Sequence, residues 1–340
     1  MSAHGTLKAQ QAPRRGVDAD GSVTLPLQRL PFSNLASAEA EHAFKHLIDD
    51  GPVTTDAEVS RAHYGRFNDA LAADMLAKYP VHVSEDTLGG VRVHRVVSQL
   101  ASPADLQRGI LINLHGGAFM WGSGNGALVE GIPIAATTNL PVVTVDYRMA
   151  PEHVFPAASE DACAVYEAIL KDFPAESIGL YGLSAGALLS AQLIAWLQKR
   201  GLQRPAAVAM LGGAGADIGG DSASLGASMT GSLPESGLAS LFSLPYLTGA
   251  DRQDPLALPD CADDVLAKFP PSLLITASRD FPASSVSSFH RRLVANGVDA
   301  RLFVFDGLWH AFHIFSELPE AQETYRIMAD FFMRTLRLKA

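Results

Sequence analysis

Cysteine is scarce in this chain. Only Cys163 and Cys261 occur among its 340 residues, far apart and without the short spacing of metal ligands. Such usage favours free thiols in a reducing compartment over a disulfide framework. Long apolar runs are missing as well: none approaches the ~18 residues that span a bilayer, and the first thirty residues hold no stretch that resembles a signal sequence. The sequence therefore predicts a cytoplasmic protein.

Positive charge is the second shortage. Lys and Arg number 26 against 36 Asp and Glu, the formal net charge is −10, and no basic cluster stands out. A nucleic-acid partner or an anionic membrane surface is therefore not expected. No metal site is predicted either, because His42 and His46 have helical spacing but no apparent third ligand. What the chain does have is 48% apolar residues, enough to bury a large core.

From residue 81 onward, short apolar runs alternate with helical patterns. We expect a hairpin over residues 81–97 around Gly89-Gly90, then strands at 110–114, 142–147, 178–181, 208–211, 273–277 and 302–305, with helices at 158–170, 185–199 and 284–295. This alternation predicts an α/β fold with a mostly parallel central sheet and helices on both faces. Chemistry is expected at the carboxyl ends of the strands.

Two segments depart from this alternation. Helical patterns at 36–49 and 56–78 precede the first strand, and residues 216–269 form a long connection rich in Ser, Gly and Pro. Long connections in compact domains are usually lids or binding elements. We therefore predict a single domain over residues 1–340, with a cap from 30–78 and 216–269 and a catalytic core from 81–215 and 270–340.

The most informative local pattern surrounds Ser184. The strand at 178–181 runs into Gly182-Leu183-Ser184-Ala185-Gly186, and a long helical pattern begins at once. A serine hydroxyl is a weak nucleophile unless a tight strand-to-helix turn exposes it beside a base. The helix N-terminus beyond that turn favours developing negative charge. The pattern predicts a nucleophilic Ser184 at the turn.

A glycine-rich turn follows the strand at 110–114, in the sequence His115-Gly116-Gly117-Ala118-Phe119. Glycines let the backbone approach a reacting carbon closely, and backbone N–H groups can then stabilise a tetrahedral oxyanion. Taken alone, the segment could equally be an ordinary strand-to-loop connection. Its place before the serine turn favours the catalytic interpretation.

A nucleophilic serine needs a histidine base and a carboxylate that orients it. His310 follows the strand at 302–305 in a loop, so we assign it the base, with His313 as the runner-up. Asp280 follows the strand at 273–277 and gives the order Ser, Asp, His that this architecture uses. Asp306 is the main alternative for the acid, although it would leave its strand before the loop can fold back.

With these residues placed, the chain resembles the bacterial hormone-sensitive-lipase type of esterase in the α/β-hydrolase superfamily. The resemblance rests on the four blocks His115-Gly116-Gly117-Ala118-Phe119, Asp146-Tyr147-Arg148-Met149-Ala150-Pro151-Glu152-His153 with Phe155-Pro156-Ala157-Ala158, the Ser184 turn, and His310-Ala311-Phe312. It implies an oxyanion hole from the N–H groups of Gly116, Gly117 and Ala185, a loop-positioning His115 and a structural His153. The chain departs from the family in having Ala118 as the third loop residue, which fits at negative φ, and Leu183 in the serine turn.

The expected activity is therefore hydrolysis of short- to medium-chain carboxylic esters through an acyl-enzyme, without a metal or organic cofactor. A lactone hydrolase or an acetyl-ester deacetylase would use the same residues. A non-catalytic receptor, such as the plant gibberellin receptor of similar fold, lacks the catalytic histidine that this chain has. Related esterases often form homodimers, but nothing in the sequence decides the oligomeric state. Candidate pocket residues are the aromatics Phe119, Trp121, Phe242, Tyr246, Trp309 and Phe312.

Overall fold

The computed structural model describes residues 16–17, 22–24, 29–49, 56–230 and 240–337. The calls on the first thirty residues and on 216–269 thus lie partly outside the described residues. The chain divides into two compact units, Met1–Ser33 and Asn34–Ala340. In the first unit, β1 (Gly16–Val17) pairs antiparallel with β2 (Val23–Thr24). Every other element belongs to the second unit.

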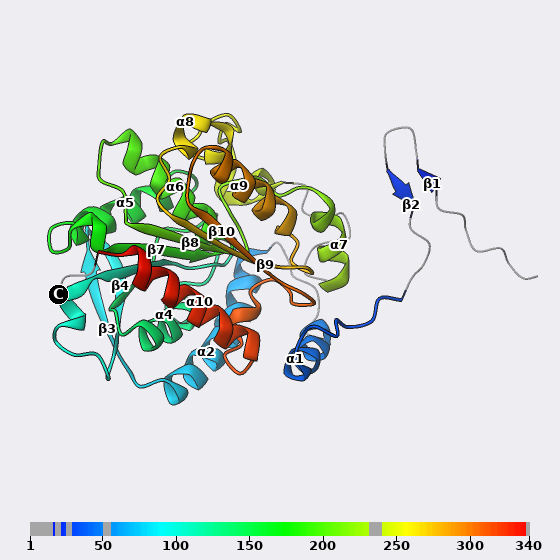
Figure 1. The fold of residues 1–340 in the computed structure, drawn as a ribbon, viewed down its shortest axis with the longest axis horizontal. Coiled ribbons are helices and arrows are strands. Elements are labelled where there is room, and N and C mark those ends of the chain that lie inside the picture. Colours follow the sequence, from blue (N-terminus) through cyan, green and yellow to red (C-terminus); the bar gives the residue numbers. More distant parts are fainter. Residues whose placement is uncertain (1–15, 18–21, 25–28, 50–55, 231–239, 338–340) are drawn as a thin grey trace, which may run out of the picture. The chain divides into compact units, whose positions relative to one another are not determined.

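An eight-stranded sheet, in the order β10-β9-β8-β7-β5-β6-β4-β3, is the centre of the second unit (Figure 1). β3 and β4 form an antiparallel hairpin, β4 pairs antiparallel with β6, and all other neighbours are parallel. The strands are β3 (Val81–Leu88), β4 (Val91–Ser98), β5 (Ile110–Leu114), β6 (Val142–Val145), β7 (Ile178–Leu183), β8 (Ala207–Leu211), β9 (Ser272–Ala277) and β10 (Ala300–Phe305). The predicted fold class is confirmed.

Helices cover both faces of this sheet, as Figure 1 shows. α5 (Ala157–Ile169), α6 (Ala185–Lys199) and α9 (Ala283–Ala295) lie on one face, and α4 (Asn125–Thr138) and α10 (Pro319–Thr335) lie on the other, with α2 (Ala57–Lys78) packed on α4. The remaining helices are α1 (Ala38–Asp49), α3 (Asp105–Arg108), α7 (Asp221–Thr230) and α8 (Asp263–Leu266), with 3₁₀ turns at Ala175–Ser177, Leu241–Ser243, Pro245–Leu247, Pro259–Cys261 and Phe312–Ile314. None of the helices in the described ranges is long and apolar enough to cross a membrane.

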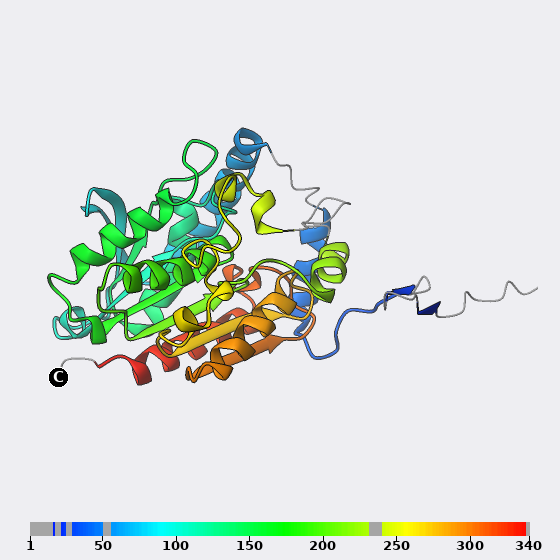
Figure 2. The same ribbon diagram turned by 90° about the horizontal axis from the view of Figure 1, so that it is seen from above.

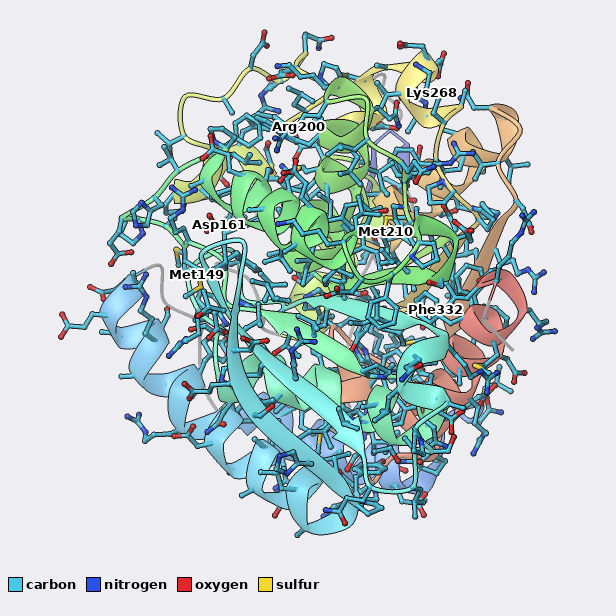
Figure 3. All side chains as sticks on the ribbon, turned by 90° about the vertical axis from the view of Figure 1, so that its left-hand side faces the viewer. Met149, Asp161, Arg200, Met210, Lys268 and Phe332 are labelled. Carbon is cyan, nitrogen blue, oxygen red and sulfur yellow. The ribbon has the colours of Figure 1, made fainter. Side chains whose placement is uncertain are left out.

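The central strands are mostly apolar because helices bury both of their faces. Every residue of β5, β7, β8 and β9 is buried, which matches the continuous apolar runs in their sequences. Met210 of β8 and Phe332 of α10, both labelled in Figure 3, belong to this packing, and Phe332 lies against the Tyr181 ring. The predicted strands and helices are confirmed with ends shifted by one or two residues.

Helices α3, α4, α7, α8 and α10 were not predicted from the sequence, and of these α4 bears most directly on the site. α4 has almost no polar face, since α2 and α10 cover the side that faces away from the sheet. Its sequence, NGALVEGIPIAATT, contains two glycines and Pro133. A helix buried on all sides lacks the 3.6-residue alternation that reveals an amphipathic one. The polar exception in its buried middle is Glu130.

Candidate active site

Ser184 sits at the carboxyl end of β7, in the middle of the sheet, and is the N-cap of α6. Its φ of 55° and ψ of −114° lie outside the regions that non-glycine residues normally adopt. Such a conformation costs about 1 to 3 kcal/mol and persists only where neighbouring contacts hold it. One contact is the Ser184 N–H, which donates to the carbonyl of Leu211 on β8 at 2.7 Å.

Two glycines make the turn around Ser184 sterically feasible. A Cβ placed on Gly186 would overlap the carbonyl oxygens of Leu114 and His115, and one on Gly182 would overlap the carbonyl of Gly186. The first turn of α6 therefore lies directly against the end of β5. This close approach brings the serine beside the glycine-rich turn that follows β5.

Replacing Gly186 should show how tight this approach is. We expect Gly186→Ala to lower the free energy of unfolding by about 3 kcal/mol or more, because backbone rather than a movable side chain opposes the new methyl group. Gly65→Ala is the matched control: Gly65 lies exposed within α2 with open space at its Cβ, so alanine should stabilise by about 0.5 to 1 kcal/mol. Denaturant unfolding of both variants measures the difference. Equal stability of the two would contradict the packing.

His310 and Asp280 complete a continuous hydrogen-bonded chain with Ser184. His310 Nε2 lies 2.9 Å from Ser184 Oγ, and His310 Nδ1 lies 2.7 Å from Asp280 Oδ1. Because a carboxylate only accepts, Nδ1 carries the proton and Nε2 is left to accept from the serine hydroxyl. The other Asp280 oxygen accepts from the Thr276 hydroxyl at 2.8 Å, and the aspartate is 1% exposed. The three side chains come from turns after β7, β9 and β10.

The sequence-level alternatives lie elsewhere. His313 is buried, and burial together with nearby His310 lowers its pKa to about 3, so its ring is neutral. Asp306 is exposed, and its charge acts on Arg279. Neither of these residues is bonded to Ser184 or His310 in the described part of the chain.

The turn after β5 runs through three consecutive residues of positive φ: 113° at Gly117, 51° at Ala118 and 59° at Phe119. The condition under which Ala118 was expected to fit in place of glycine, a negative φ, is thus not met. The turn is closed by the N–H groups of Met120 and Trp121, which both donate to the Gly117 carbonyl. Successive backbone N–H groups in a tight turn can form an anion-binding concavity, which makes the N–H groups of this turn candidates for holding an oxyanion.

The N–H groups of this turn are not equivalent. Gly116 N–H donates to Glu130 Oε1 at 2.8 Å, which differs from its predicted place in the oxyanion hole. The reason is that α4 brings a buried carboxyl directly behind the turn. The N–H groups of Gly117, Ala118 and Ala185 have no acceptor within the residues described, and all three residues line the same cavity as Ser184.

Residues of the second motif block hold the turn from below. Tyr147 stacks on the His115 ring with centroids 4.2 Å apart, and its hydroxyl donates to the His115 carbonyl at 2.7 Å. His115 Nδ1 lies 2.6 Å from the Gly116 carbonyl, in line with its expected role in positioning the loop. Arg61 of α2 holds the same region: its guanidinium donates to the carbonyls of Met120 and Ala150 and pairs with Glu152.

His153 does not have the structural role implied by the resemblance. Its side chain is exposed. The block is instead anchored by Arg148, whose backbone N–H and guanidinium both donate to Asp161 of α5, next to Met149 in Figure 3. A bidentate, partly buried arginine pair fixes the local backbone more firmly than an exposed imidazole.

A cavity of ≈ 570 Å³ opens over Ser184 and His310. Tyr64 and Phe67 of α2 form one wall and Leu241 and Leu244 form another; Figure 2 shows the N-terminal part of α2 near the yellow-green turns that contain these leucines. The remaining lining is mostly apolar and includes Leu183, Leu188, Ile218, Phe281, Pro282 and Ile314. Both segments predicted as a cap thus contribute to the cavity wall.

Of the six aromatics predicted for the pocket, only Trp121 lines the cavity, where it stacks on Tyr64 at 4.6 Å. Phe119 and Tyr246 stack on each other at 4.0 Å in the core behind the turn. Trp309 and Phe312 are likewise buried in the core, and Phe242 lies under the Arg252 guanidinium, 4.4 Å from the ring centroid. The prediction for these five is wrong because large aromatic side chains fill cores more often than they line pockets.

Comparison with known proteins fits this geometry. A family model described as the alpha/beta hydrolase fold matches residues 111–314, from β5 to the turn after His310. The chain belongs to this family. Among solved structures, an esterase called E25 is 29% identical with a TM-score of 0.75, covering 92% of this chain and 99% of that chain. An esterase of the bacterial hormone-sensitive lipase family is 27% identical with a TM-score of 0.76, covering 88% of this chain and 98% of that chain.

Named relatives among α/β hydrolases agree with these structures. An acetyl-hydrolase of Streptomyces hygroscopicus is 28% identical over 252 residues, which are 72% of this chain and 82% of the relative. An esterase of Acinetobacter venetianus is 26% identical over 259 residues, 74% of this chain and 82% of the relative. The resemblance to bacterial esterases of the hormone-sensitive lipase type is confirmed.

Proposed function

We propose that this α/β hydrolase cleaves short- to medium-chain carboxylic esters through an acyl-enzyme, with Ser184 as nucleophile, His310 as base and Asp280 as the carboxylate partner. The observation that carries the proposal is the unbroken chain of short contacts from Asp280 through His310 to Ser184 Oγ, which opens on an apolar cavity. A nucleophile, a base held by a third group and unpartnered donors nearby are the parts that acyl transfer requires.

In the first half-reaction, Ser184 Oγ attacks the ester carbonyl while His310 Nε2 takes the hydroxyl proton. The carbonyl oxygen becomes an oxyanion that we assign to the N–H groups of Gly117, Ala118 and Ala185. Gly116 is omitted from the hole because its N–H already donates to Glu130. His310, now charged, is stabilised by buried Asp280 and gives its proton to the leaving alcohol.

In the second half-reaction, water takes the place of the alcohol. His310 Nε2 removes a proton from this water, which attacks the acyl carbon and forms a second oxyanion in the same donors. Collapse of this intermediate returns the proton to Ser184 Oγ and releases the acid. Because the same hydrogen bonds serve both steps, loss of any one of them should slow both.

The cavity wall supports a cap that encloses the substrate. We infer that α2 and the turns at 241–247 form this cap, since each places apolar side chains over Ser184. Asp217 tethers the second segment: it accepts from the Leu241 N–H and the Ser240 hydroxyl and pairs with Arg252. A cytoplasmic location remains a prediction from the sparse cysteines.

A profile of substrates tests the function. With a cavity of ≈ 570 Å³, we expect kcat/KM for p-nitrophenyl acetate and butyrate to exceed that for the laurate by about tenfold or more. The acetyl-hydrolase of Streptomyces is the reason to compare acetate with butyrate closely, because an acetyl-ester preference is the second candidate. A five- or six-membered lactone in the same assay separates a lactone hydrolase from an esterase. Absence of turnover on all of these would contradict ester hydrolysis.

A further inference from the structure

Glu130 is a buried carboxyl in the wall of the active-site cavity that the mechanism above does not use. It lies on α4, with the side chain 7% exposed. Oε1 accepts from the Gly116 N–H at 2.8 Å, and Oε2 accepts from Asn113 Nδ2 on β5 at 2.9 Å. The carboxyl therefore links α4 to Asn113, near the end of β5, and to Gly116, which directly precedes the assigned oxyanion donor Gly117.

Occupation of the Gly116 N–H has a consequence for the two residues that follow. Gly116 is held toward α4, and the chain must then turn left-handed through Gly117 and Ala118, whose N–H groups stay without an acceptor in the described chain. Without an acceptor behind it, the Gly116 N–H would be buried and unsatisfied. The turn would then have to rotate to find another partner.

We propose that Glu130 is a positioning residue for this hydrolase: by accepting the Gly116 N–H it fixes the turn at Gly117 and Ala118 so that their N–H groups face the oxyanion. The proposal rests on the function proposed above and extends it to a residue outside the catalytic triad. Glu130 itself touches neither Ser184 nor His310 among its described hydrogen bonds. Its effect passes through the backbone of Gly116.

The surroundings of Glu130 suit either form of the carboxyl. The Tyr181 hydroxyl donates to the Glu130 backbone carbonyl at 3.1 Å and fixes this turn of α4 on the sheet. The second amide atom of Asn113, Oδ1, is buried without a partner. If the amide is turned over, Oδ1 can accept a proton from a neutral Glu130, and the contact with Gly116 is kept.

Ionisation of Glu130 should then appear in the rate. Burial raises the pKa of its carboxyl to about 8, against the hydrogen bonds from Gly116 and Asn113 that favour the charged form. The groups facing it stay neutral in this range, because burial raises the pKa of the Tyr147 and Tyr181 phenols well above their usual value and lowers that of His115. Above about pH 8, a negative charge forms behind the oxyanion donors and opposes the developing oxyanion, so kcat should fall as pH rises.

Three variants of the full chain test the proposal. Glu130→Gln keeps an oxygen that can accept the Gly116 N–H and mimics the neutral acid, whereas Glu130→Met keeps the length of the side chain and loses the acceptor. Thr138→Val is the control on the same helix. The buried Thr138 hydroxyl donates to the Ile134 carbonyl and accepts from the Leu140 N–H, both at the C-terminal end of α4. Steady-state kinetics on p-nitrophenyl butyrate from pH 6 to 10 give kcat and KM, and circular dichroism checks folding.

We expect Glu130→Met to lower kcat by about ten- to a hundredfold with KM changed less than threefold, since misplaced donors affect the transition state more than substrate binding. Glu130→Gln should stay within threefold of the parent at pH 7 and lose the alkaline decline, and Thr138→Val should keep both. A folded Glu130→Met with kcat within twofold of the parent, or a Glu130→Gln as impaired as Glu130→Met, overturns the proposal. If Glu130→Met does not fold, the pH profile of Glu130→Gln decides: an unchanged decline overturns it and a lost decline supports it.

Labelling by a serine-reactive phosphonate separates this proposal from the proposed function. If the parent is labelled at Ser184 and hydrolyses esters, the function stands whatever the Glu130 variants do. If neither occurs, the function itself fails. With the function intact, slower labelling of Glu130→Met in parallel with its kcat supports a damaged oxyanion hole, because the phosphonyl oxygen occupies the same donors.

Discussion

Ser184→Ala should reduce the hydrolysis of p-nitrophenyl butyrate by about 10⁴-fold or more in kcat. The methyl group cannot form the acyl-enzyme, and the donors that remain support only the slower direct attack of water. Purified parent and variant, compared at equal concentration with Michaelis–Menten kinetics, give the ratio. KM should change little because the hydroxyl contributes little to the apolar cavity that binds the substrate.

Ser190→Ala provides the control for this loss. Ser190 lies on the same helix, is buried, and donates to the Gly186 carbonyl at 2.8 Å. Its replacement removes an equivalent hydroxyl and leaves the hydrogen-bonded chain of Asp280, His310 and Ser184 in place, so the rate should remain within about threefold of the parent. Substantial turnover by Ser184→Ala would refute Ser184 as the nucleophile.

Asp280→Asn should lower kcat by about 10³- to 10⁴-fold. An amide in this place has no negative charge to stabilise the His310 imidazolium, and it can offer an N–H where the ring needs an acceptor. The buried setting strengthens the effect, because only the Thr276 hydroxyl and His310 bond to the carboxylate side chain in the described chain. The size of the loss separates this role from a structural one, provided that the melting temperature stays near that of the parent.

Asp306→Asn distinguishes between the two aspartates that the sequence offers. Asp306 is exposed and precedes His310 closely in sequence. The carboxyl that contacts His310 Nδ1 is nevertheless that of Asp280. Asp306→Asn should therefore keep at least half of the parent kcat. A larger loss in Asp306→Asn than in Asp280→Asn would reverse the assignment.

Much of the fold follows from sequence because its strands are buried on both faces. Runs such as 110–114 and 273–277 are apolar except for Asn113 and Thr276, and the structure keeps them as β5 and β9 with nearly the same bounds. Helices such as α5 and α9 were predicted because one face of each meets the core, although α10, which has a buried face as well, was not. α4 was not predicted because it is apolar on nearly all sides and contains Pro133, so its sequence lacks the 3.6-residue alternation of an amphipathic helix.

The candidate site divides in the same way. Ser184, Asp280 and His310 were found from the order of strand ends, because parallel strands direct their carboxyl ends to one edge of the sheet. Contacts that depend on packing between helices and strands could not be predicted in this way. The lone acid within the apolar run GALVEGIPIAA was a signal for Glu130, but only the three-dimensional structure shows that it meets the Gly116 N–H.

The pocket aromatics failed for another reason. Residue type alone does not tell whether a ring faces a cavity or the core, since both environments are apolar. Phe119 illustrates this: it directly follows Ala118, which lines the cavity, yet its ring is fully buried and stacks on Tyr246. The cavity wall instead uses Tyr64, Phe67 and Phe281, aromatics that the prediction left out, together with aliphatic side chains from elements that lie far apart in sequence.

Arg61 connects substrate entry with the chemistry. The Arg61 guanidinium on α2 donates to the carbonyl of Met120, at the far end of the turn to which we assign oxyanion donors, and to the carbonyl of Ala150 in the second motif block. Shortening or removing α2 to admit bulkier esters would also remove Arg61, so we expect the wider substrate range to come with a lower catalytic rate. Redesign for larger substrates is better directed at Leu241 and Leu244, which line the cavity and, within the described residues, make no hydrogen bond to that turn.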